Sequence, residues 1–227
     1  DTNSDGNVNV TTSLRQPGSS IKVINYAYAL GHGYTPASIL DDSPVTFSVA
    51  GQSPYSPKNY DGKYRGRLTL RSALAESRNI PAVKVLASYG VLKMIDLGGE
   101  MGITSWENPS NYGLSLTLGG GEIKLIDLAK VYATVANYGV APEVKSILKI
   151  ITPKGKVLEN NACPPFCEGK QVLDARIAYL LIDILKDNTA RTPAFGANSA
   201  LVISGHPEVA VKTGTSNDLH DNLTIGF

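Results

Sequence analysis

The sequence predicts an α+β fold, in which helical segments are combined with antiparallel strands. Apolar residues recur at helical spacing in several separate segments, and the clearest of these is 121–139. Apolar residues also alternate on both sides of the Pro-Lys-Gly turn in residues 143–159, a pattern typical of a β-hairpin. A chain of 227 residues with 42% hydrophobic side chains suffices for one large domain or two small lobes.

The first helix is expected to begin at residues 17–19 and to run to about Leu30, because an apolar periodic run follows this Pro-Gly-Ser turn. Residues 31–67 are rich in Gly, Pro, Ser and Tyr, so an irregular crossing is expected there. Helical spacing returns at residues 68–90, with an expected break near residues 79–81, where a proline stands.

The second half of the chain contains further helices and two strands. A short helix is expected at residues 91–102, ending at its glycines, and the helix of residues 121–139 is expected to close at Gly139. Beyond the predicted hairpin, helical spacing appears once more. This later helix and the two short strands near the chain end are expected at residues 174–188, 208–214 and 222–227.

Charge and hydropathy exclude two classes of function. The formal net charge of +1 gives no electrostatic reason to expect nucleic acid as a partner. No apolar run approaches the roughly 18 residues needed to span a membrane. The chain has no initiator Met and no visible signal peptide at its start, so we expect a processed product or a piece of a longer protein.

Two adjacent serines and a lysine follow the first turn, in the segment RQPGSSIK. Ser19 and Lys22 have i, i+3 spacing, which places both side chains on one helical face, whereas Ser20 points around the helix. A serine at a helix start has free backbone N–H groups beside it, and a lysine of lowered pKa can take its proton. An ordinary N-cap with a solvated lysine fits the same residues. The spacing alone is weak evidence, because Ser146 and Lys149 repeat it in the predicted hairpin, where they face opposite ways.

Two further motifs place polar side chains at the ends of predicted elements. The residues SRN, 77–79, fall where a helix breaks, so their side chains can face a cleft, although capping would use the same residues. The residues KTGTSND, 212–218, follow an apolar strand, and the glycine lets backbone approach a ligand closely. A plain turn is the alternative for this second motif.

In chain order, Ser-x-x-Lys, Ser-x-Asn and Lys-Thr-Gly resemble the signature of the penicillin-recognising serine acyl-transferases. The similarity extends to RQPGSSIK, LTLRSALAESRNIPAVKVL, YGLSLTLGGGEIKLIDLAKVYATVANYG and VAVKTGTSND, which look like the transpeptidase domain of bifunctional, class A penicillin-binding proteins. This resemblance covers nearly the whole chain. It implies an antiparallel sheet packed between helices, together with a mainly helical lobe.

The resemblance implies a catalytic role for five residues. Ser19 is expected to be the acylated nucleophile, and Lys22 the base that takes its proton. Ser77 is expected to pass a proton toward the leaving amine. Asn79 is expected to hold the substrate amide and orient Lys22, and Lys212 to tune the electrostatics around Ser77.

Substrate binding is assigned by the same resemblance to the strand that follows Lys212. The hydroxyls of Thr213 and Thr215, on either side of Gly214, are expected to engage the terminal carboxylate of the substrate. The oxyanion hole is expected to consist of the backbone N–H groups of Ser19 and Thr215.

The implied activity is that of a D,D-transpeptidase of peptidoglycan biosynthesis, a serine enzyme that needs no cofactor or metal. A stem peptide ending in D-Ala-D-Ala would esterify Ser19 and release its last D-Ala, and an amine of a neighbouring stem would resolve the ester. Beta-lactams mimic D-Ala-D-Ala and would remain attached. The alternatives are a D,D-carboxypeptidase or beta-lactamase, in which water resolves the ester, and a non-catalytic penicillin-binding sensor or remnant.

Residues 1–227 are accordingly expected to form a partial transpeptidase domain on the extracytoplasmic side of the membrane. The family's glycosyltransferase domain and membrane anchor are expected to lie outside these residues, and the full-length protein is expected to be membrane-anchored. Two strands precede the nucleophile helix in the family, and here they are expected to be either missing or reduced to a remnant near residues 7–10. The family continues after its Lys-Thr-Gly strand with two more strands and a helix, so an incomplete sheet is expected at Phe227.

Residues 1–6, DTNSDG, match the start of a calcium loop through Asp1, Asn3, Asp5 and Gly6. Thr12 stands where the loop needs an acidic ligand, so a polar turn is the better interpretation. The glycine-rich residues 118–122 lack the Lys-Ser/Thr of a phosphate-binding loop.

Cys163 and Cys167 lie in a Pro-rich loop and are expected to be peripheral to the chemistry. Two cysteines alone do not make a zinc site. They form either a local disulfide or free thiols, and a disulfide would require an oxidising compartment.

Overall fold

The computed structural model describes residues 6, 8–48, 53–162, 167–216 and 220–227. Its helices are η1 (Gly18–Ile21), α1 (Lys22–Gly31), α2 (Leu70–Ala75), α3 (Asn79–Tyr89), α4 (Val91–Met101), η2 (Pro109–Asn111), η3 (Leu114–Leu118), α5 (Leu125–Ala136), α6 (Ala175–Lys186) and α7 (Asn188–Phe195). Its strands are β1 (Leu14–Arg15), β2 (Ile39–Asp42), β3 (Gly66–Thr69), β4 (Ile123–Lys124), β5 (Val140–Pro142), β6 (Lys149–Ile151), β7 (Val157–Asn160), β8 (Gly169–Gln171), β9 (Val211–Thr215) and β10 (Asn222–Gly226).

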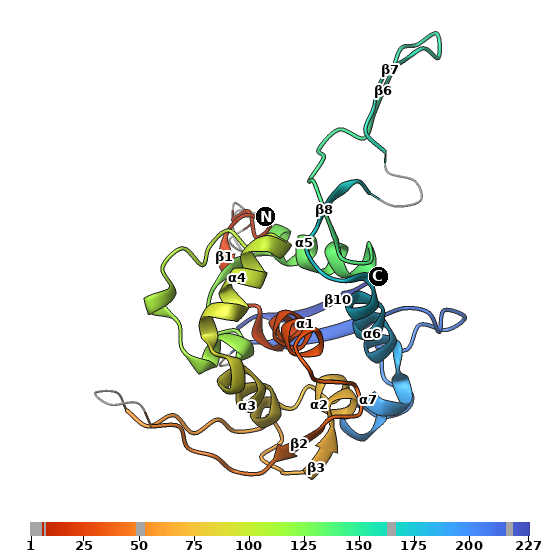
Figure 1. Ribbon diagram of the computed structural model, residues 1–227. Helices are drawn as coiled ribbons and strands as arrows, with labels where there is room; N and C mark the ends of the chain where they lie inside the picture. Colours follow the sequence, from red (N-terminus) through yellow and green to blue (C-terminus); the bar gives the residue numbers. More distant parts are fainter. Residues whose placement is uncertain (1–5, 7, 49–52, 163–166, 217–219) are drawn as a thin grey trace.

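Helix α1 forms the centre of the molecule, with the other helices arranged around it (Figure 1). Its sequence KVINYAYALG is apolar on nearly every side, which is the composition of a helix buried all round. Eight of its ten residues are buried, and α2, α3, α4 and α6 pack against it. The residue that begins this helix, Lys22, is therefore held in the core of the protein.

The strands pair in two-stranded antiparallel ladders within the described part of the chain. The β9–β10 hairpin contacts η1, α5 and α6, so it lies among helices, and its blue strands pass behind α1 in Figure 1. Its register pairs Thr215 with Asn222 and Val211 with Gly226. This combination of helices and small antiparallel sheets confirms the predicted α+β class.

The predicted hairpin of residues 143–159 is present as β6–β7, and it projects from the body of the molecule (Figure 1). Every residue of both strands is exposed. Lys149 begins β6 and Ser146 lies just before it, so this second Ser-x-x-Lys lies outside the core.

Most predicted helices are present, with shifted boundaries. The break expected at residues 79–81 lies at residues 76–78, and Asn79 begins α3. Pro81 is the third residue of this helix, where its missing N–H would have no intrahelical partner in any case. The helix expected from residue 121 begins at Leu125, because residues 123–124 pair as β4 with β1.

The start of the chain and the segment after α6 differ from the expectations. Residues 8–10 form no strand, and the strand that precedes the Pro-Gly-Ser turn is β1 at Leu14–Arg15. The helix α7 was not predicted. Asp1, Asn3 and Asp5 lie outside the described residues, whereas Gly6 is an exposed turn residue.

Cys167 takes part in a disulfide, and its backbone N–H bonds to Asn137 Oδ1 at 3.2 Å; Cys163 lies outside the described residues. No helix in the described ranges has the length and apolar character required to cross a membrane.

Candidate active site

Ser19 and Lys22 are brought together by a turn of 3₁₀ helix. Ser19 lies in η1, and its carbonyl accepts the backbone N–H of Lys22. In a 3₁₀ turn the side chains at i and i+3 eclipse one another, so the two face the same side more closely than in an α-helix. The backbone N–H of Ser19 belongs to the first turn, whose amides have no intrahelical acceptor.

The two adjacent serines have different environments. Ser19 is partly exposed, whereas Ser20 is fully buried. Ser20 Oγ donates a hydrogen bond of 2.6 Å to the carbonyl of Pro17, and its own carbonyl accepts from Tyr132 Oη at 2.8 Å. Ser20 therefore fixes the turn and cannot meet a substrate from solvent.

Lys22 is fully buried and reaches the Ser-Arg-Asn motif. Its Nζ donates to Asn79 Oδ1 and to the carbonyl of Ser77, both at 2.7 Å. Burial lowers the pKa of the Lys22 ammonium well below its usual value, and the positive charges of Lys212 and Arg78 lower this pKa further. The result is an amine that exists in its neutral, basic form more readily than a surface lysine.

Ser77 connects the two lysines. Its hydroxyl accepts a hydrogen bond of 2.8 Å from Lys212 Nζ, while its carbonyl accepts from Lys22. Its φ of 60° is in the left-handed region, which a non-glycine residue rarely adopts. Burial, with the nearby charge of Arg191, lowers the pKa of Lys212 to about 7.

Two glycines allow β9 to pack against the nucleophile turn. A methyl group on Gly18 would lie 2.6 Å from the backbone nitrogen of Thr215, and one on Gly214 would lie 3.0 Å from the backbone nitrogen of Ser20. Gly18 also has a φ of 54°. The backbone of Thr215 therefore lies directly beside the residue that precedes Ser19.

The structure thus gathers all eight predicted site residues around one turn: Ser19, Lys22, Ser77, Asn79, Lys212, Thr213, Gly214 and Thr215. Their functional groups are hydroxyls, two buried amines, one amide and backbone N–H groups. This donor set has no carboxylate, imidazole or thiolate and does not suit zinc or calcium. It suits the movement of a proton between a hydroxyl and an amine.

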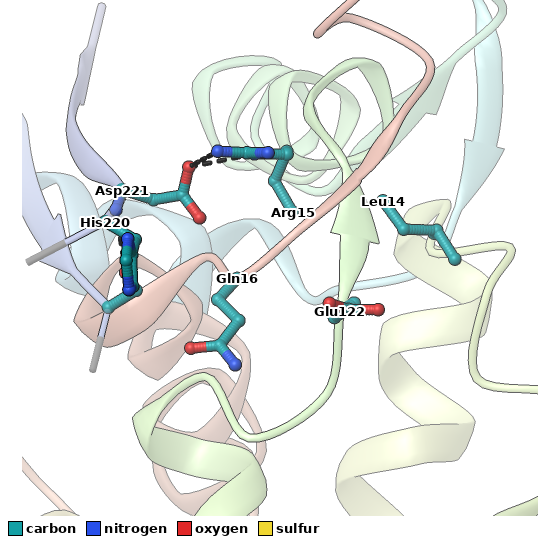
Figure 2. Close-up of a pocket in the computed structure, with 7 residues that line it drawn as sticks. Leu14, Arg15, Gln16, Glu122, His220 and Asp221 are labelled. Carbon is teal, nitrogen blue, oxygen red and sulfur yellow. Dashed lines mark hydrogen bonds and ion pairs between the residues drawn. The ribbon is translucent and has the colours of Figure 1, made fainter. Parts of the chain in front are cut away.

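A pocket of about 310 Å³ lies at the end of β9, beside the nucleophile turn. Its lining includes both partners of the Arg15–Asp221 ion pair and Gln16 just before the turn (Figure 2). The other lining residues are Leu14, Glu122, Ser216 and His220. Arg15 Nη2 lies 2.7 Å from Asp221 Oδ1, which ties β1 to the start of β10. Arg15 and Gln16 stand directly before the Pro-Gly-Ser turn but belong to none of the three motifs.

A second group that the motif analysis did not use lies behind Ser77. Arg78, inside the Ser-x-Asn motif itself, is buried and forms an ion pair with the fully buried Asp42 at 2.9 Å. The position of Arg78 between Ser77 and Asn79 was a sequence signal for this ion pair. Its partner Asp42 lies on the distant strand β2 and could not be identified from spacing.

Comparisons with known proteins point to one family. The family model described as "Penicillin binding protein transpeptidase domain" matches residues 2–224. Penicillin-binding protein 1A of Neisseria lactamica is 35% identical over 224 residues, which are 96% of this chain and 27% of that protein. Penicillin-binding protein 1A of Rickettsia bellii is 33% identical over 241 residues, with 96% and 29% covered. The chain thus spans under a third of these relatives.

Solved structures agree in fold. Penicillin-binding protein 1A from Haemophilus influenzae gives a TM-score of 0.78 at 27% identity, over 98% of this chain and 38% of that chain. The PonA1 protein from Mycobacterium tuberculosis in complex with penicillin V gives a TM-score of 0.75 at 24% identity, over 97% of this chain and 59% of that chain.

Proposed function

We propose that the chain, which belongs to the penicillin-binding protein transpeptidase domain family, acts as a D,D-transpeptidase through an ester on Ser19. One observation carries this proposal. Two buried lysines of lowered pKa meet at Ser77, and one of them, Lys22, lies a single turn after a partly exposed serine.

In the proposed acylation, neutral Lys22 takes the proton of Ser19, and Ser19 Oγ bonds to the penultimate D-Ala carbonyl carbon. The bond from this carbon to the terminal D-Ala nitrogen breaks. The leaving nitrogen takes the proton of the Ser77 hydroxyl, which Lys212 holds at 2.8 Å, and the proton that Lys22 took from Ser19 restores this hydroxyl. In the second step an amine of a neighbouring stem attacks the ester and restores the Ser19 hydroxyl.

Backbone N–H groups are proposed to bind the tetrahedral intermediate. The N–H groups of Ser19 and Thr215 are proposed as the oxyanion hole, and the approach of Thr215 to Gly18 supports this assignment. The hydroxyls of Thr213 and Thr215 are proposed to hold the terminal carboxylate. Asn79 serves two purposes in this account: its Oδ1 orients Lys22, and its amide group engages the substrate.

The proposed partners are stem peptides ending in D-Ala-D-Ala and the beta-lactams that mimic them. The penicillin V complex of the related PonA1 fold supports beta-lactam binding. The location that suits this substrate is the extracytoplasmic side, with the full-length protein anchored in the membrane. Residues 1–227 are proposed as a partial transpeptidase domain, with the glycosyltransferase domain elsewhere in the protein.

Incubation of the full-length protein with a D-Ala-D-Ala peptide and an amine acceptor tests this proposal. Mass spectrometry should detect one free D-Ala for each cross-linked product, and Ser19→Ala should remove both. A hydrolysed peptide without cross-links would favour a D,D-carboxypeptidase, and hydrolysed penicillin a beta-lactamase. Acylation without turnover would favour a penicillin-binding sensor or remnant.

A further inference from the structure

A buried polar network lies behind the Ser-Arg-Asn motif, with Asp42 at its centre. Asp42 ends β2 and is completely buried. One of its oxygens accepts from Asn59 Nδ2 at 2.7 Å, and the other accepts from Arg78 Nε at 2.9 Å and from the backbone N–H of Arg65 at 3.0 Å. The carboxylate is therefore fully hydrogen-bonded, as a buried charge must be.

Asn59 links this carboxylate to the start of α3. Its Oδ1 accepts the backbone N–H groups of Asn79 at 2.9 Å and Ile80 at 3.3 Å. These amides are among the first of the helix, and the residue in the N-cap position, Arg78, supplies no side-chain cap. A side chain from a distant loop thus caps the helix that carries Asn79.

Arg78 holds the same segment from the other side. Besides Asp42, its guanidinium bonds to Asp61 Oδ2 at 2.9 Å and to the carbonyl of Lys63. Its neighbour Ser77 has a φ of 60°, a strained conformation that persists only where its surroundings impose it. The guanidinium contacts on the next residue supply that constraint.

We propose that Asp42, Asn59 and Arg78 form a positioning network that holds Ser77 and Asn79 in the geometry needed to serve Lys22. This inference rests on the proposed function of the same site. None of the three side chains is placed against substrate. They act through the backbone of residues 77–80, and Asp42 is the member that joins the other two.

The position of Asn79 sets the 2.7 Å contact to Lys22, so loss of the network should slow the chemical step of acylation. A misplacement of about 1 Å is enough to reduce a rate by about 10²-fold. Initial penicillin binding should change much less, because it depends on the β9 strand as well.

The test is Asp42→Asn in the full-length protein, with Asp41→Asn as the matched control. Asp41 is the preceding residue of the same strand, but it is exposed and pairs with Lys84. Stopped-flow measurements with a fluorescent penicillin separate the acylation rate constant from the dissociation constant of the initial complex. Asp42→Asn should lower the rate constant about 10²-fold and leave the dissociation constant within about threefold. Asp41→Asn should change neither.

Two further measurements separate positioning from general stability. The exchange variant Asp42→Asn with Asn59→Asp restores an amide–carboxylate hydrogen bond with donor and acceptor reversed, and it should recover part of the lost rate. Amide hydrogen exchange at Asn79 and Ile80, measured without ligand, should speed up in Asp42→Asn and not in Asp41→Asn. If Asp42→Asn does not fold, Arg78→Lys, which keeps the charge and loses the forked contacts, takes its place.

An Asp42→Asn protein with unchanged acylation and unchanged amide exchange at residues 79–80 would overturn the inference. If Asp42→Asn lowered both the acylation rate constant and the thermal stability, and the double variant with Asn59→Asp recovered neither, the network would have a structural role only. That result would also overturn the inference. Absence of acylation in the unaltered protein would instead contradict the proposed function. In that case amide hydrogen exchange at Asn79 and Ile80 would still decide whether the network holds Asn79.

Discussion

Lys22 and Lys212 are the residues whose environment determines the chemistry of the site. Both are buried, and an ammonium ion loses much of its hydration energy on burial, so their neutral forms are favoured. Their mutual repulsion adds to this effect at Lys22. A serine hydroxyl is a weak nucleophile near neutral pH, and in the proposed acylation the neutral amine one turn away is the base that it lacks.

Replacement of Lys22 by Ala should lower the rate of penicillin acylation by about 10²–10⁴-fold, because the general base is removed. The matched control is Lys149→Ala, which removes the exposed lysine of the second Ser-x-x-Lys on the projecting hairpin. Gel-based labelling with a fluorescent penicillin over time measures both rates. Acylation of Lys22→Ala at the original rate would exclude Lys22 as the base.

The sequence favours Ser19 over Ser20 through i, i+3 spacing to Lys22, which is a local property. The complete burial of Ser20, beside a partly exposed Ser19, could not be predicted in this way. Ser20 is buried through its bond to Pro17 and its contact with Tyr132, and Tyr132 lies on a helix far along the chain. The ion pair of Arg78 was missed for the same reason, since its partner Asp42 lies on β2, distant from Arg78 along the chain.

At the scale of elements, the contact between η1 and β9 brings the turn of the proposed nucleophile to the strand that is proposed to bind substrate. Gly18 permits this contact, both because its φ is 54° and because the backbone of Thr215 occupies the space where a side chain would begin. A change at this point therefore tests the alignment of two elements without altering a reactive group.

Gly18→Ala should destabilise the protein by about 1–3 kcal/mol through overpacking and should reduce acylation by about 10²-fold through displacement of Thr215. Gly155→Ala is the control: its φ is 80°, but no atom lies within 4 Å of the added methyl group. It should cost about 1 kcal/mol from backbone strain and leave acylation unchanged. Chemical denaturation and acylation rates measure the two effects, and equal acylation of both variants would refute the proposed contact.

Elements with a strong local period could be predicted, and those fixed by distant contacts could not. The β6–β7 hairpin and the last two strands follow alternating sequence and turn residues. The start of α5 was placed too early because residues 123–124 have helical apolar spacing but pair with β1. Helix α7 carries Pro193 and little apolar periodicity, so its sequence gave no signal beyond the cap by Asp187.

For the whole molecule, the buried titratable groups predict an optimum of stability in alkaline solution. Lys212 has a pKa of about 7 in the folded protein against 10.5 when exposed, so between these values the unfolded chain binds more protons and stability rises with pH. Lys22 acts in the same direction. The pKa values of buried Tyr26, Tyr89 and Tyr132 are raised above 10.0, so their contribution is lost as pH rises beyond that value.

The free energy of unfolding should therefore increase from pH 7 toward pH 9 and decrease above about pH 10. Urea denaturation at a series of pH values measures this dependence. Lys212→Met, which removes the titrating amine, should flatten the rise between pH 7 and pH 9 and leave the alkaline decrease in place. A stability that falls steadily from pH 7 upward in the unaltered protein would contradict the burial of these lysines.

At this largest scale, the α+β class followed from periodicity, but the meeting of Ser77 with Lys212 did not. These residues are 135 positions apart, and only the resemblance of the three motifs to a known family brought them together in advance. The spacing of neighbouring residues predicts helices and strands. The packing of β9 against η1 and α6 depends on contacts between residues far apart in the chain, which spacing does not predict.

The central claim is that Ser19 carries the acyl group, and peptide mapping of the penicillin adduct on the full-length protein tests it most directly. Mass spectrometry of the digested adduct should place the added mass on Ser19. Ser19→Ala should abolish labelling, and Ser20→Ala should retain it, because Ser20 is buried and bonded to Pro17. An adduct on Ser20 or Ser146, or the absence of any adduct on the folded protein, would contradict the account.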